Sequence, residues 1–174
     1  MASTVESKTV LGLPTDIMWD SPIGGAYLIW RFVRGYQQIN EAGPNVLLLY
    51  PAIAIVLNRR LAKEISHSWS LVDFAYAFQD SSGKNTKTLT GLHEQICNQK
   101  GWVLKSIEFA LVTRLVELNP STGLVSAVLQ SENPTSRTTA RKFKDSDGLK
   151  AELLGKMFAN TKEGSIAYYL GVKF

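Results

Sequence analysis

The sequence contains few of the residues from which metal and catalytic sites are usually built. Its 174 residues include one cysteine, Cys97, and two histidines, His67 and His93. A single cysteine cannot form a disulfide within the chain, and it cannot supply a cysteine-based structural zinc site. Neither histidine belongs to an HExxH or CxxC pattern, and a lone histidine is more often a surface or packing residue than a ligand. We therefore expect no metal and no cofactor.

Motifs for nucleotide binding and for acid–base catalysis are also missing. The sequence has no GxxxxGK[ST] and no GxGxxG motif, and Gly24-Gly25 is not followed by the lysine that a phosphate-binding loop needs. The acidic residues show no pairing that is typical of general acid–base catalysis. We expect that the chain is not an enzyme. A small enzyme that uses Cys97 with His93, four residues earlier on a predicted helix, is an alternative, although a buried structural thiol is the favoured interpretation.

Long hydrophobic runs and secretory signals are missing as well. The longest apolar stretch, Val46–Leu57, contains Pro51 and is about twelve residues long, whereas a membrane-spanning helix needs roughly 20. The first residues, MASTVESKTV, have no basic segment followed by an apolar run. The net charge of +4, from 19 Lys and Arg against 15 Asp and Glu, is compatible with a nucleic-acid or an acidic protein partner. We expect a soluble, cytoplasmic protein that does not associate with membranes.

The densest apolar material lies in the first third of the chain. Pro22–Gln38 has apolar residues at spacings of three and four, the period of a helix that buries one face: Ile23, Ala26, Tyr27, Trp30, Val33 and Tyr36. Leu28, Ile29 and Phe32 fill much of the remaining circumference. This pattern predicts a helix that is packed on nearly all sides and forms the centre of the core.

Further helices and one β-hairpin are predicted in the rest of the chain. Helical periodicity recurs in five segments, namely Leu49–Asn58, Trp69–Phe78, Thr86–Asn98, Trp102–Leu118 and Leu149–Asn160. Gly101 is expected to separate the third and fourth segments. The turn signal Asn119-Pro120-Ser121-Thr122-Gly123 lies between two apolar runs and predicts a hairpin within Leu115–Gln130.

Together these elements predict an α+β fold that is predominantly α-helical, with a compact helical core and a short β-hairpin. A hairpin placed directly after a helix makes the fold winged-helix-like. The length is that of one domain with a real core, so we predict a loose arm at residues 1–16 and a single domain at residues 17–174. The core is expected to include most of the large aromatic residues, namely Trp30, Tyr36, Trp69, Trp102, Tyr168 and Tyr169. The predicted buried face of the last long helix consists of Leu149, Leu153, Leu154, Met157 and Phe158.

Basic residues gather at three places along the chain. The clusters are Arg31 with Arg34; Arg59, Arg60 and Lys63; and Arg137, Arg141, Lys142 and Lys144 around Phe143. Each cluster is either a solvated face or a contact for DNA or for an acidic partner, where several converging charges make binding sensitive to salt. The third cluster is the better candidate because it adjoins the predicted hairpin and contains an aromatic residue.

Several segments, in order, resemble the middle-component proteins of three-component ABC-ATPase systems, the bacterial anti-phage and anti-plasmid operons of the Lamassu type. The early helix ends in Arg34-Gly35-Tyr36, and the following apolar segment runs into Asn58-Arg59-Arg60. The C-terminal element carries Leu154-Gly155 and Phe158 and finishes in Leu170-Gly171-Val172. The resemblance extends from about Pro22 to the end of the sequence, with Ser21-Pro22 where the family usually has asparagine–proline.

The resemblance implies a non-enzymatic accessory subunit with two protein partners. One partner would be an SMC-like ABC ATPase that senses DNA, and the other a separate effector, often a nuclease. The subunit would bridge or restrain these two until DNA engagement rearranges the complex, and any contact with DNA would be made within that complex. No small-molecule substrate is expected. The alternative is a free-standing winged-helix regulator that binds DNA as a homodimer, with Trp102–Leu118 or a neighbouring helix for recognition and Leu115–Gln130 as the wing.

Overall fold

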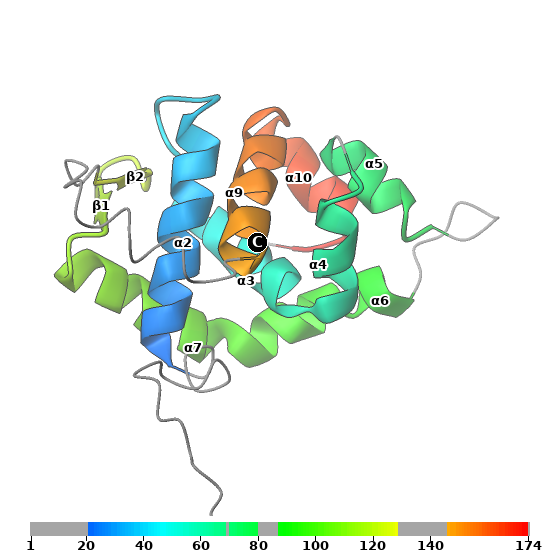
Figure 1. Ribbon diagram of the computed structural model, residues 1–174, viewed down its shortest axis with the longest axis horizontal. Coiled ribbons are helices and arrows are strands. Elements are labelled where there is room, and N and C mark those ends of the chain that lie inside the picture. Colours follow the sequence, from blue (N-terminus) through cyan, green and yellow to red (C-terminus); the bar gives the residue numbers. More distant parts are fainter. Residues whose placement is uncertain (1–20, 69, 80–86, 129–145, 174) are drawn as a thin grey trace, which may run out of the picture.

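The computed structural model describes residues 21–68, 70–79, 87–128 and 146–173, and the fold of these residues is predominantly helical with one small sheet (Figure 1). The predicted α+β class is confirmed. The helical elements are α2 (Pro22–Gln37), the 3₁₀ turn η1 (Val46–Leu48), α3 (Leu49–Leu57), α4 (Arg59–Ile65), α5 (Leu71–Tyr76), α6 (Lys87–Thr90), α7 (Leu92–Val112), α9 (Ser146–Ala159) and α10 (Glu163–Leu170). The strands are β1 (Val116–Leu118) and β2 (Val125–Ala127). The predicted arm at residues 1–16 lies outside the described residues.

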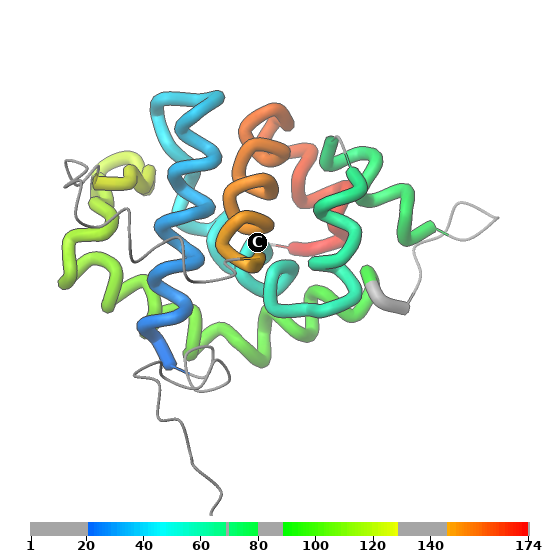
Figure 2. The backbone as a smooth tube through the Cα atoms, in the orientation of Figure 1, coloured from blue at the N-terminus to red at the C-terminus, as the bar shows by residue number. Residues whose placement is uncertain are grey.

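Helix α2 is the centre of the core, as predicted. It packs against α9, α7, α3 and β2, and Figure 2 shows α2 and α9 running side by side through the molecule. Leu28, Ile29 and Phe32 have no exposed surface, so the helix is covered on most of its circumference. Ile23 is an exception, because its side chain is 55% exposed near the start of the helix.

Glycines allow α2 to approach its neighbours closely. A Cβ atom built on Gly35 would overlap the carbonyl oxygen of Glu152 in α9 and would lie 2.7 Å from its carbonyl carbon. On the α9 side of the same crossing, a Cβ on Gly155 would overlap the carbonyl oxygen of Phe32. The Phe32 and Phe158 rings meet edge to face beside this crossing, with centroids 5.4 Å apart. Helices α2 and α9 therefore touch backbone to backbone, at a distance that only glycine permits.

Helix α7 differs from the prediction in its middle and at its C-terminal end. It runs without interruption from Leu92 to Val112, so Gly101 does not break it. Gly101 is exposed, and a glycine there costs about 1 kcal/mol relative to alanine, which is small beside the packing of a helix this long. The helix ends six residues before the predicted Leu118, because Arg114 adopts a left-handed conformation with φ of 55°. The Leu115 N–H then donates to the Ala110 carbonyl at 2.9 Å, which closes the helix end.

The buried face of α9 is also different from the predicted one. Leu154, Met157 and Phe158 are buried as expected, but Leu149 and Leu153 are 56% and 40% exposed. The buried residues of α9 instead include three small ones, Gly148, Ala151 and Gly155, and at Gly155 the backbone of α2 leaves no room for a larger side chain.

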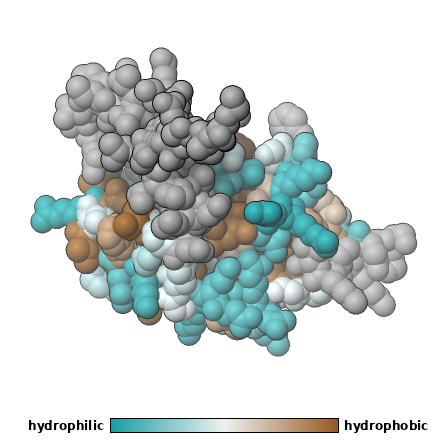
Figure 3. Space-filling view, turned by 60° about the horizontal axis from the view of Figure 1, so that its bottom comes forward, coloured by the Kyte–Doolittle hydropathy of each residue, from teal (hydrophilic) through white to brown (hydrophobic). Residues whose placement is uncertain are grey.

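The aromatic residues divide between the core and the surface. Tyr36 is buried, Trp30 and Trp102 are half-buried, and Tyr168 is 80% exposed, so its assignment to the core is wrong. Trp69 lies outside the described residues. The face seen from below in Figure 3 likewise shows several hydrophobic areas among hydrophilic ones. Exposed apolar side chains are common on protein surfaces.

The predicted β-hairpin follows α7 directly. Its strands are antiparallel, with Val116 opposite Ala127, Glu117 opposite Ser126 and Leu118 opposite Val125. Val116 and Val125 are buried, so the hairpin belongs to the core along one face. In Figure 1, β2 lies on the side of the hairpin that faces α2, and its contacts with α2 agree with this position. These features confirm the hairpin but do not establish a winged-helix arrangement.

Candidate interaction surface at the end of helix α2

Two surface pockets flank the last turns of α2, where the polar residues of this helix are concentrated. The first has a volume of about 300 Å³ and is lined by Arg34, Gln37, Gln38, Glu41 and Ala127. The second has a volume of about 360 Å³ and lies on the other side of the helix end, between the loop at 40–43, Leu124 and the α9–α10 connection at 159–163. Parts of the chain that are far apart in sequence therefore meet around one helix end.

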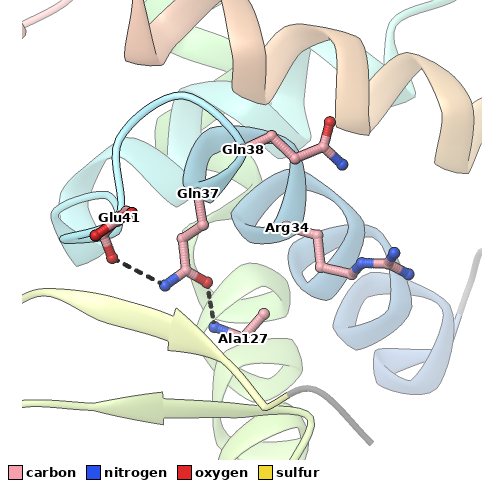
Figure 4. Close-up of a pocket in the computed structure, with 5 residues that line it drawn as sticks. All are labelled: Arg34, Gln37, Gln38, Glu41 and Ala127. Atoms are coloured by element: carbon pink, nitrogen blue, oxygen red, sulfur yellow. Dashed lines mark hydrogen bonds between the residues drawn. The ribbon is translucent and has the colours of Figure 1, made fainter. Parts of the chain in front are cut away.

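Gln37 holds the hairpin against this end of α2. Its Oε1 atom accepts a hydrogen bond of 2.8 Å from the Ala127 N–H, and its Nε2 atom donates to the Glu41 carbonyl at 3.3 Å. Figure 4 shows both bonds, with Arg34 and Gln38 on the neighbouring turns of the helix. The hairpin is held a second time by the Val125 N–H, which donates to the Pro44 carbonyl at 2.9 Å. The wall of the first pocket that the hairpin forms is therefore held by hydrogen bonds.

Arg31 and Arg34, which were predicted to act together, have different surroundings. The Arg31 guanidinium forms an ion pair with Glu152, with Nη2 and Oε2 3.0 Å apart, and both side chains are less than a fifth exposed. The other carboxylate oxygen of Glu152 accepts a hydrogen bond from Gln38 at 3.1 Å. Arg34 instead lies over the Trp30 ring, 4.7 Å from its centroid, and lines the first pocket. Arg31 thus links α2 to α9, and Arg34 is the better placed of the two to meet a partner.

Tyr36, in the last turn of α2, lines the second pocket. Burial raises the pKa of its hydroxyl above the ordinary value of 10.0, the negative charge of Glu163 adds to this, and a hydrogen bond from the Asn40 side chain opposes it. The Asn40 Oδ1 atom accepts from the Ala42 N–H at 3.2 Å, which orients the Asn40 amide. The pocket therefore presents a neutral phenol beside the exposed charges of Lys162 and Glu163.

The second basic cluster is exposed on α4. Asn58 caps this helix by accepting hydrogen bonds from the N–H groups of Arg60 and Leu61. Arg59, Arg60 and Lys63 are exposed, and none of them forms an ion pair with another described residue. Positive charge in the first turn of a helix is unfavourable, because the helix dipole is positive there. With no acidic partner among the described residues, these side chains are candidates for contact with an anionic partner.

The third basic cluster, Arg137, Arg141, Lys142, Phe143 and Lys144, lies outside the described residues. The structure therefore does not place the cluster that the sequence favours most.

Cys97 and His93 are close together, but the prediction that the Cys97 thiol is buried is wrong. Cys97 is exposed, with its Sγ atom 3.8 Å from the His93 Nε2 atom. The His93 Nδ1 atom is buried and has no hydrogen-bond partner among the described residues. A catalytic cysteine–histidine pair normally has a third group that orients the histidine. Within the described ranges, no group of three or more His, Cys, Asp or Glu residues could hold a metal ion.

The sequence did not predict a role for the polar residues around the helix end. Gln37, Gln38 and Asn40 follow Arg34-Gly35-Tyr36 as a polar run at the end of an otherwise apolar helix. That abrupt change of polarity is the only sequence signal for the two pockets. It does not show that the hairpin and the α9–α10 connection complete their walls, since those contacts are tertiary.

The fold and the surface pockets define a small, predominantly helical domain whose polar residues converge at one end of its central helix. Comparison with protein families matches residues 18–174 to ABC-three component (ABC-3C) system Middle Component 3, and the chain belongs to this family. This match confirms the resemblance to middle components that Arg34-Gly35-Tyr36 and the C-terminal segments indicated. No curated protein and no solved structure matches the chain. Among the described helices, none combines the length and the apolarity needed to cross a membrane.

Proposed function

We propose that this chain is a non-catalytic accessory subunit that connects an SMC-like ABC ATPase to a separate effector, often a nuclease. The complex would act in a Lamassu-type defence system against phages or plasmids. The observation that carries the proposal is the match of residues 18–174 to a middle component of three-component systems, since a middle component implies partners. The chain's own role is then to present surfaces to those partners.

The geometry of the described surface supports two separate contacts. One is the end of α2, where the two pockets, the hairpin and the α9–α10 connection lie together. The other is the exposed basic cluster of Arg59, Arg60 and Lys63 on α4. A bridging subunit needs at least two such surfaces, one for each partner. The basic cluster suits an acidic protein surface or the DNA that the ATPase engages.

Co-purification with the other two components tests the proposal. The full chain is expressed with the ABC ATPase and the effector of its own system, and a tag on this chain is used for capture. We expect both components to be recovered. The variant Arg34→Ala should weaken recovery of one component and Arg59→Ala with Arg60→Ala recovery of the other, each without loss of folding. Recovery of neither component with the wild-type chain would refute the proposal.

The alternative function, a winged-helix regulator that binds DNA by itself, is favoured by one observation, the hairpin directly after α7. Gel filtration and binding to short duplex DNA discriminate the two functions. A regulator is a homodimer and binds duplex DNA without partners. The accessory subunit should bind DNA weakly alone and should need the ATPase.

The Cys97–His93 pair provides a test of the non-catalytic role. Cys97→Ser removes the thiol from an exposed position, so the fold should not change. We expect defence by the complete system to be unaffected, and a loss of defence with normal complex assembly would assign chemistry to this chain.

A further inference from the structure

The two strands of the hairpin differ in how their outer edges are used. The outer edge of β2 is occupied, because the Ala127 N–H donates to Gln37 and the Val125 N–H donates to Pro44. Strand β1 has β2 on one side, and no backbone hydrogen bond joins Val116 or Leu118 to any described residue beyond the hairpin. An unoccupied strand edge is a template for another strand.

The hydrogen-bond register shows which groups of β1 point outward. The Val128 N–H donates to the Leu115 carbonyl at 3.0 Å, and the Asn119 N–H donates to the Leu124 carbonyl at 2.9 Å. Hydrogen-bonded pairs alternate with non-bonded pairs in antiparallel strands, so the bonded pair between these two is Glu117 with Ser126. The N–H and C=O groups of Val116 and Leu118 therefore point away from β2. Among the described residues, these four backbone groups have no partner, and they have the spacing that an extended chain requires.

The side chains of β1 indicate what the added strand must be. Val116 is buried, Leu118 is half-buried, and Glu117 is exposed on the opposite face. A second copy of this chain could add its own β1 antiparallel to the first, with Val116 of each strand opposite Leu118 of the other. The two Glu117 carboxylates would then lie opposite each other. Like charges in directly opposite positions destabilise a strand pair, and a charge on an edge strand is a common protection against self-association. The edge is therefore unfavourable for a second copy.

We propose that the outer edge of β1 binds an extended strand of another component of the three-component system, one with a basic side chain opposite Glu117 and apolar side chains on either side of it. The apolar residues would continue the buried face of the hairpin beside Val116 and Leu118. Main-chain hydrogen bonds would supply affinity, and the alternating side chains would supply specificity. This inference deepens the proposed function, on which it depends, by naming one surface and the chemistry of its partner.

The test removes one outward N–H without disturbing the hairpin. Leu118→Pro lacks the N–H that points outward, and proline is tolerated at such edge positions. Leu118→Ala is the matched control, because it shortens the side chain and keeps the N–H. Both variants are captured from cells that also express the ABC ATPase and the effector. We expect Leu118→Pro to have a Tm close to that of Leu118→Ala. We expect it to bind one of the two components at least about tenfold more weakly than Leu118→Ala does, because one main-chain hydrogen bond is lost and the proline ring clashes with the added strand.

Two substitutions at Glu117 complete the design. Glu117→Pro removes the N–H that bonds to Ser126, so the hairpin and the thermal stability should suffer. Glu117→Lys keeps the hairpin and reverses the charge, so binding of the same component should weaken and the chain should stay monomeric. If Leu118→Pro fails to fold, Glu117→Lys decides the question.

Three results would overturn the inference. They are equal binding by Leu118→Pro and Leu118→Ala, unchanged binding by Glu117→Lys, or a wild-type homodimer that Leu118→Pro dissociates. Capture of neither component by the wild-type chain would instead refute the proposed function itself, so the two failures are distinguishable.

Discussion

Gly35→Ala is the substitution whose effect the structure determines most directly. A methyl group on Gly35 meets the backbone of Glu152, with the carbonyl carbon at 2.7 Å and the Cα atom at 2.8 Å. A backbone cannot rotate away as a side chain can, so α9 has to move away from α2. That movement would loosen the Phe32–Phe158 ring contact and the ion pair between Arg31 and Glu152.

The expected magnitude follows from two opposing effects. Overpacking a well-packed core costs about 1–3 kcal/mol, and the upper end applies here because the obstacle is a helix backbone. Alanine has a helix propensity about 1 kcal/mol better than glycine, which offsets part of the cost. We expect a net loss of about 2 kcal/mol in the free energy of unfolding. In a domain of this size that corresponds to a fall in Tm of roughly 4–8 °C.

Gly101→Ala is the matched control, since Gly101 lies inside a helix but has no heavy atom within 4 Å of a Cβ position. It should stabilise the chain by about 0.5–1 kcal/mol through propensity alone. Denaturant unfolding followed by circular dichroism measures both changes as shifts of the midpoint at constant m. Gly25→Ala should fall between them, because its obstacles are the side chains of Ser106 and Trp102. If Gly35→Ala were as stable as Gly101→Ala, the close contact of α2 with α9 would be refuted.

Three further outcomes are expected. Arg114→Gly should raise the free energy of unfolding by about 0.5–1 kcal/mol, because glycine adopts φ of 55° without strain; an unchanged or lower Tm would contradict the left-handed helix end. The pKa of Tyr36 is raised in the folded state, so the unfolded chain loses this proton first and the free energy of unfolding should fall as pH rises above about 10. Tyr36→Phe should make that fall shallower. Parallel curves of unfolding free energy against pH for the two proteins would exclude the effect. Glu152→Gln removes the partially buried partner of Arg31 and should cost about 1–3 kcal/mol; a double-mutant cycle with Arg31→Met measures the coupling, and additive effects would show that the pair contributes nothing.

The elements that local sequence specifies were predicted well. The apolar periodicity of Pro22–Gln38 identified the central helix to within one residue, and the turn signal at Asn119–Gly123 identified the hairpin. The errors occur where local preference and tertiary packing disagree. Gly101 is a poor helix residue that α7 nevertheless includes, and Leu149 is an apolar residue that the packing of α9 leaves exposed.

The candidate surface was only partly predictable for the same reason. Arg34 and the α4 cluster were identified as basic residues, but charge alone could not show that the neighbouring Arg31 is held in an ion pair. Nor could it show which polar residues line a common pocket, because Gln37 and Ala127 are 90 residues apart and meet only in the folded chain.

By itself the sequence determined the class of the fold, the position of its central helix and, through Arg34-Gly35-Tyr36 and the C-terminal segments, the family. These properties depend on periodicity and on short motifs, which act over one or two helical turns. Only the tertiary structure decided which glycines lie at helix contacts, which arginine forms an ion pair and which strand edge has no partner among the described residues. Each of those depends on the distance between residues far apart in the chain, and that distance is set by packing of the whole core rather than by any local preference.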